Sequence, residues 1–119
     1  MATFSTHILS SLDGTHLSDV LISLVEIPRD GNKKLVFQEK TDSGGRMTIQ
    51  FLPKIGKGFE YQIIVSMPES FDIIGQKGKA VKNANLSSIS LGIKFENTDA
   101  NYHMPFILSP NGFSGWVSR

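Results

Sequence analysis

Short apolar stretches separated by turn-forming residues constrain this chain more than any other feature. Stretches of strand length alternate with clusters of Gly, Asn, Asp and Pro along most of the sequence. This spacing is typical of antiparallel sheets, because helices need longer periodic segments without such breakers. We therefore predict an all-β, two-sheet antiparallel sandwich, with strands near 4–10, 20–28, 33–40, 46–52, 59–67, 86–96 and 102–109 and a further short strand near 113–117.

Glycine-containing clusters mark where the chain should reverse. They contain residues that tolerate positive φ: Asp13-Gly14, Asp30-Gly31-Asn32, Ser43-Gly44-Gly45 and Gly56-Lys57-Gly58. One segment favours a different structure. A short helix is expected from Pro68 to Ile74, because proline suits the first helical turn and an acidic residue there suits the helix dipole.

Length and charge exclude several kinds of protein. A chain of 119 residues is the size of one domain, so we expect a single domain over residues 1–119. Twelve basic residues against eleven acidic ones leave no field that would gather nucleic acid or a membrane surface. Without cysteine there is no disulfide and no thiolate chemistry. A soluble, cytoplasmic protein is the expectation, since neither a targeting segment nor a span is visible.

The last long strand alternates with a period of two, and both of its faces are largely apolar. Met104, Phe106 and Leu108 share one face, and the residues between them share the other: His103, Pro105, Ile107 and Ser109. A monomeric sandwich normally presents one polar face to water. The second face is therefore expected to form an interface or a lined groove that contains His103. In the first strand, His7 likewise lies on the face opposite Phe4.

Three separated motifs, in the right order, resemble a known family. They are Ser5-Thr6-His7-Ile8-Leu9, Thr41-Asp42-Ser43-Gly44-Gly45-Arg46 and the segment from His103 to Gly115. The chain resembles the transthyretin-related family that includes 5-hydroxyisourate hydrolase. That family carries Ser-Thr-His-Val-Leu, then Thr-Asp-x-x-Gly-Arg, then a His-x-Pro strand followed by Ser-Pro-Tyr-Gly-Tyr-Ser. The resemblance implies a transthyretin-like sandwich, a homotetramer built as a dimer of dimers, and active sites in the channel between the dimers.

The resemblance also implies that His7, Arg46 and His103 are catalytic. Hydrolysis of a cyclic amide needs a base for water, an acid for the departing nitrogen and a donor for the oxygen that gains charge. Two imidazoles and a guanidinium can supply these roles, with no cofactor. Taken singly, a strand histidine is more often structural than catalytic. His16 lies outside the motifs and is expected to be a surface residue. The histidines lack the spacing of a preformed metal site, so no metal is expected.

The end of the chain differs from the family pattern. It reads Trp116-Val117-Ser118-Arg119, where the family's hydrolases end in Tyr-Arg-Gly-Ser. We expect Trp116, Ser118 and Arg119, together with Ser114, to bind substrate, although Trp116 could instead anchor an interface. Three functions stay open. They are a 5-hydroxyisourate hydrolase of purine catabolism, a diverged enzyme that hydrolyses, cyclises or moves a proton on another heterocycle, and a binder of small ligands without catalysis.

Overall fold

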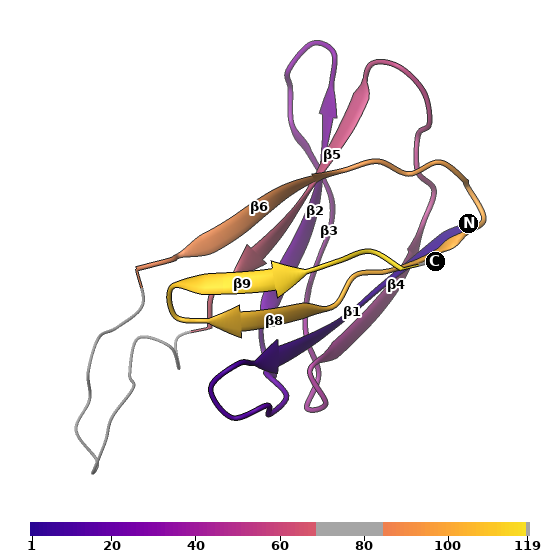
Figure 1. Ribbon diagram of the computed structural model, residues 1–119. Helices are drawn as coiled ribbons and strands as arrows, with labels where there is room; N and C mark the ends of the chain where they lie inside the picture. Colours follow the sequence, from indigo (N-terminus) through magenta and orange to yellow (C-terminus); the bar gives the residue numbers. More distant parts are fainter. Residues whose placement is uncertain (69–84, 119) are drawn as a thin grey trace.

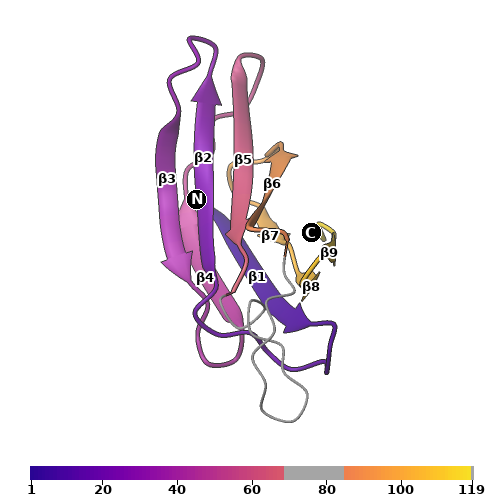
Figure 2. The ribbon, with the colours of Figure 1, turned by 90° about the vertical axis from the view of Figure 1, so that its left-hand side faces the viewer.

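The computed structural model describes residues 1–68 and 85–118 and shows two β-sheets packed face to face (Figure 1). The first sheet has the order β4-β1-β8-β9, with β7 also paired to β1, and the second has the order β3-β2-β5-β6 (Figure 2). The strands are β1 (Ala2–Ser10), β2 (Leu21–Pro28), β3 (Lys34–Lys40), β4 (Arg46–Phe51), β5 (Phe59–Ser66), β6 (Ser88–Ile93), β7 (Asn101–His103), β8 (Phe106–Ser109) and β9 (Gly112–Gly115).

This architecture confirms the all-β, two-sheet sandwich predicted from the sequence. The described residues contain no helix. The helix expected from Pro68 to Ile74 falls almost wholly outside them. Each predicted glycine turn includes a residue with positive φ, namely Gly14, Gly31, Gly45, Gly56 and Gly58.

Two predicted strands were too long. The strand expected over 102–109 is two pieces, β7 and β8, because Pro105 has no N–H for the ladder. Both pieces nevertheless pair parallel to β1 in one register, as the partners Ser5–His103 and Ile8–Phe106 show. The hydroxyl of Thr6 bridges the interruption by donating to the Met104 carbonyl at 2.6 Å. The strand expected over 86–96 covers only Ser88–Ile93.

The core lies between the sheets and is rich in aromatic rings. Phe4 and Phe106 from the first sheet are fully buried, as are Ile22 and Ile63 from the second. Phe95 contacts three further rings edge to face, with centroids about 5 Å apart: Phe51, Tyr61 and Tyr102. Because the odd-numbered residues of β1 point away from this core, they form the outer face of the first sheet.

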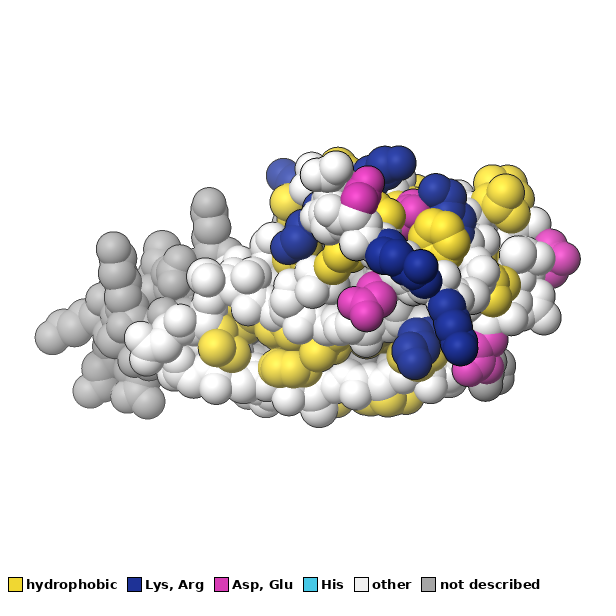
Figure 3. All heavy atoms as spheres, turned by 90° about the horizontal axis from the view of Figure 1, so that it is seen from above, with side chains coloured by type: hydrophobic (Ala, Val, Ile, Leu, Met, Phe, Trp, Pro, Cys, Tyr) yellow, Lys and Arg dark blue, Asp and Glu magenta, His cyan; other side chains and the backbone are white. Residues whose placement is uncertain are grey.

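Charged side chains of both signs lie on the surface. In the view of Figure 3, basic, acidic and apolar side chains are interspersed over the face. This agrees with the near balance of twelve basic and eleven acidic residues. In the part of the chain that the structure describes, no helix has the length and apolar character needed to cross a bilayer.

Candidate functional site

The outer face of the first sheet brings the predicted residues together through strand register. His7 on β1 lies opposite Arg46 on β4, and Ser5 on β1 lies opposite His103 on β7. Directly opposed residues project to the same face, so the three predicted catalytic side chains share one surface. His103 lies opposite Ser5, two residues before His7 on β1, and is therefore the diagonal neighbour of His7 across the pair of strands β1 and β7. Both histidines are half-buried and Arg46 is exposed.

The C-terminal segment adds three more predicted residues to this face. Ser118 forms an isolated bridge with His103, with backbone hydrogen bonds of 2.9 and 2.8 Å in the two directions. The bridge continues the register of β8 and β9, in which Ser114 is the partner of Ile107. Trp116 therefore falls opposite Pro105, with its side chain 51% exposed. Arg119 lies outside the described residues.

A tight turn between β3 and β4 positions Arg46. One carboxylate oxygen of Asp42 accepts hydrogen bonds from the backbone N–H groups of Gly44 and Arg46, at 2.9 and 3.0 Å. The N–H of Arg46 is the main cause that holds the pKa of Asp42 below its ordinary value, with a further contribution from Gly44. These bonds fix the first residue of β4. They explain physically why an aspartate precedes the two glycines and the arginine in the motif.

His103 is oriented by a residue that the sequence did not single out. The Ser5 hydroxyl lies 2.8 Å from Nδ1 of His103, in hydrogen-bonding contact. This contact leaves Nε2 of His103 as the ring nitrogen available to a ligand. Ser5 and His103 are 98 residues apart in sequence, so only the parallel pairing of β1 with β7 brings them together.

His16 is the second residue that sequence reasoning missed. It is exposed, as predicted, but its Nδ1 lies 2.8 Å from Nε2 of His7, and the two rings stack with centroids 4.9 Å apart. His16 is the bridge partner of Leu9, which lies two residues from His7 on the same face. The Asp13-Gly14 turn was visible in the sequence, but the pairing of Leu9 with His16 is centred one residue earlier, between Leu12 and Asp13, so the turn alone did not place His16 beside β1.

The surroundings of His7 favour its neutral form. Burial lowers the pKa of His7, and the Arg46 guanidinium and His16 lower it further. The Gly44 backbone opposes them by raising this pKa, and His103 has the smallest effect, again lowering it. An imidazole that stays neutral near pH 7 can accept a proton.

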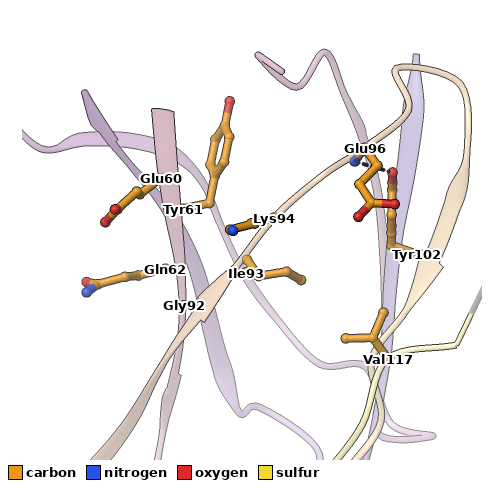
Figure 4. Close-up of a pocket in the computed structure, with 9 residues that line it drawn as sticks. All are labelled: Glu60, Tyr61, Gln62, Gly92, Ile93, Lys94, Glu96, Tyr102 and Val117. Atoms are coloured by element: carbon orange, nitrogen blue, oxygen red, sulfur yellow. Dashed lines mark hydrogen bonds between the residues drawn. The ribbon is translucent and has the colours of Figure 1, made fainter. Parts of the chain in front are cut away.

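A separate cavity of about 610 Å³ opens between the second sheet and the C-terminal segment (Figure 4). Its lining includes Tyr61, Ile93, Tyr102 and Val117, together with charged side chains such as Glu60 and Lys94. No histidine lines it. We place the candidate site on the outer face instead, because that face gathers the imidazoles and the guanidinium.

The described residues contain no group of three or more His, Cys, Asp or Glu side chains placed to hold a metal ion. The pair His7 and His16 supplies only two nitrogen ligands, and a zinc site uses at least three protein ligands. The side chains gathered on this face can transfer protons through their imidazoles and bind anions through Arg46.

The fold and this face together define a class, a transthyretin-like sandwich with paired imidazoles on the outer face of one sheet. The chain belongs to the HIUase/Transthyretin family, whose profile matches residues 4–117. It is 24% identical over 112 residues to the 5-hydroxyisourate hydrolase of Halalkalibacterium halodurans, a match that covers 92% of each chain.

Solved structures agree on the fold. The 5-hydroxyisourate hydrolase of Klebsiella pneumoniae superposes with a TM-score of 0.69 at 24% identity, covering 98% of this chain and 99% of that one. Transthyretin from Sparus aurata gives a TM-score of 0.72 at 15% identity, over 97% of this chain and 95% of the other. The family thus contains both hydrolases and transthyretins.

Proposed function

We propose that this protein is a cyclic amide hydrolase that opens the ring of 5-hydroxyisourate, or of a closely similar heterocycle, in purine catabolism. One observation carries the proposal: His7, Arg46 and His103 lie on neighbouring rows of a single sheet face. The 5-hydroxyisourate hydrolase of H. halodurans, which aligns over most of this chain, supports the same reaction. A cytoplasmic location and a small-molecule substrate belong to this proposal.

The roles follow from the environment of each group. His7, whose pKa is lowered, accepts a proton from the water that attacks the ring carbonyl. His103, held at Nδ1 by Ser5, offers Nε2 to the nitrogen that leaves. Arg46 donates to the oxygen that gains charge as water adds. Water thus adds to the carbonyl carbon, the carbon–nitrogen bond breaks, and the nitrogen leaves with a proton.

The C-terminal segment favours a second candidate, an enzyme that acts on another heterocycle. Ser118 shares the face of His103 and supplies a hydroxyl there. Val117 lines the separate cavity with Tyr102, and it is a valine where the family's hydrolases carry arginine. At this position an apolar side chain therefore replaces the positive charge that a site for 5-hydroxyisourate is expected to carry. A non-catalytic binder is less well supported, because a binder has less need of titratable groups gathered at one site.

The experiment follows the ultraviolet decay of freshly generated 5-hydroxyisourate with the natural protein and two variants. His7→Asn and His103→Asn should each reduce turnover by at least about a hundredfold, the usual scale of a lost acid or base. Glu39→Gln, an exposed change on β3 of the second sheet, serves as the control and should keep turnover. Near-normal turnover in either histidine variant would remove that histidine from the mechanism. If the natural protein shows no turnover, the remaining candidates are an enzyme that acts on another heterocycle and a non-catalytic binder of small ligands.

A further inference from the structure

His16 is held in place by a loop that has its own hydrogen bonds. Residues 11–17 fold back onto β1, with backbone hydrogen bonds from Ser10 to the Thr15 carbonyl at 2.8 Å and from Leu17 to the Ile8 carbonyl at 3.0 Å. The carboxylate of Asp13 secures the turn by accepting from the N–H and the hydroxyl of Thr15. The loop therefore sets the position of His16 relative to β1.

The neighbouring turn leaves room for His16. A Cβ built on Gly45 would lie 2.6 Å from the Ile8 carbonyl oxygen and 3.2 Å from Cβ of His16. The N–H of Ile8 also donates to the Gly45 carbonyl at 2.8 Å. The turn that carries Arg46 and the loop that carries His16 thus pack against each other beside β1.

The contact between the two rings limits the number of protons that they can carry together. A hydrogen bond between two nitrogens needs one N–H and one lone pair, so one proton lies between Nε2 of His7 and Nδ1 of His16, which are 2.8 Å apart. We propose that His16 is a positioning residue for His7, and that the two imidazoles act as one unit that shares this proton and carries at most one positive charge.

This inference rests on the proposed function only for its consequence in catalysis. The neutral pair holds two protons on four nitrogens, and the proton taken from water makes three. One of these still lies between the rings, and the charge is shared across them. A fourth proton would set N–H against N–H and break the contact.

Charged groups around the pair act on His7 in both directions. Arg46 on β4 and His103 on β7 disfavour a positive charge on His7, whereas the nearby carboxylate of Asp42 attracts it. On the other side, His16 shares a surface hollow with Asp19 and Lys40. Because the pKa of His7 is lowered, activity that needs the neutral pair should persist below the ordinary histidine value of 6.5 and be lost as the pH falls further.

The test titrates the imidazoles by NMR in the nitrogen-labelled protein and in two variants. His16→Asn keeps a hydrogen-bonding group near the Nδ1 position without a titrating ring, and His16→Phe keeps a stacked ring without nitrogens. In the natural protein, the His7 signals should titrate in two coupled steps, because His7 shares a proton with the adjacent imidazole. In His16→Asn, His7 should titrate in a single step with a raised pKa, because one repelling charge is gone. Thermal unfolding of each variant checks that the fold is kept.

Turnover of 5-hydroxyisourate is the second readout. His16→Phe should lower kcat about tenfold with little change in KM, less than the loss of a direct acid or base, and His16→Asn should recover most of it. Unchanged titration of His7 in both variants would overturn the inference, even if the protein hydrolyses the substrate. If the natural protein has no turnover, the proposed function fails while the titration still decides whether the pair shares a proton.

Discussion

At the scale of single residues, Gly45 shows how one position can serve both the fold and the site. Its φ of 72° lies in the left-handed region, where residues with a side chain are strained. A Cβ there would also approach the Ile8 carbonyl to 2.6 Å, closer than any neighbour can accept. Glycine therefore lets the turn pack against β1 beside the loop that carries His16, with Arg46 opposite His7 and His16 opposite Leu9.

Gly45→Ala should lower the free energy of unfolding by roughly 2–5 kcal/mol, the sum of left-handed strain and a close contact. Gly14→Ala is the matched control, because Gly14 also has a positive φ but has no atom within 4 Å of the added Cβ. It should cost only about 1–2 kcal/mol. Urea unfolding of the three proteins measures both values. Equal costs at the two positions would show that the close approach to β1 carries no energy.

At the scale of elements, the interrupted strand β7–β8 and the segment after β9 determine the shape of the site. Pro105 breaks the ladder, yet β7 and β8 keep one register against β1, so His103 stays beside Ser5. The chain then reverses, and Ser118 pairs back with His103. Backbone pairing thus delivers a hydroxyl to the face of His103, although the last four residues differ from those of the family's hydrolases.

Replacing the last four residues by Tyr-Arg-Gly-Ser tests what the natural terminus does. The natural protein should open 5-hydroxyisourate slowly, with a loss of roughly 2–4 kcal/mol in transition-state stabilisation, the scale of one missing preorganised donor. The replacement should recover part of this loss. The measurement compares ultraviolet decay of the substrate at equal protein concentrations. A fast natural enzyme that the replacement damages would mean that Trp-Val-Ser-Arg already completes the site.

At the scale of the whole molecule, the outer face of the first sheet has the character of an interface. Pro105 and Ile107 lie on it and are half-buried, and Trp116 beside them is 51% exposed. A patch of this kind is poorly suited to water, and a second copy facing it would turn an open surface into a lined channel. We therefore propose a homotetramer, a dimer of dimers, in which this channel encloses the imidazoles.

Sedimentation of the natural protein at micromolar concentration should give a tetramer. Ile107→Lys should yield a smaller species and lose turnover, because a charge would be buried between facing sheets. Ile64→Lys is the matched control, since Ile64 is a half-buried isoleucine on the outer face of the second sheet. It should remain tetrameric. A natural protein that sediments only as a monomer would remove the channel from the proposed mechanism.

The sequence by itself determined the fold class, the turns and most strand positions, because these depend on local patterns. The period of two in β1 placed Phe4 toward the core and His7 on the outer face, and the Asp-Gly and Gly-Gly pairs marked the reversals. Three motifs in the right order also indicated the HIUase/Transthyretin family, to which the chain belongs.

Only the tertiary structure decided which side chains meet. Ser5 contacts His103 across 98 residues of sequence through a parallel pairing, and parallel pairing leaves no local signal in the chain. His16 was predicted to be a surface residue and is exposed, yet the loop that folds back onto β1 brings it to His7. The register between strands places polar side chains that are far apart in the sequence on a single face, where they can act together. The identity of any one residue does not determine this.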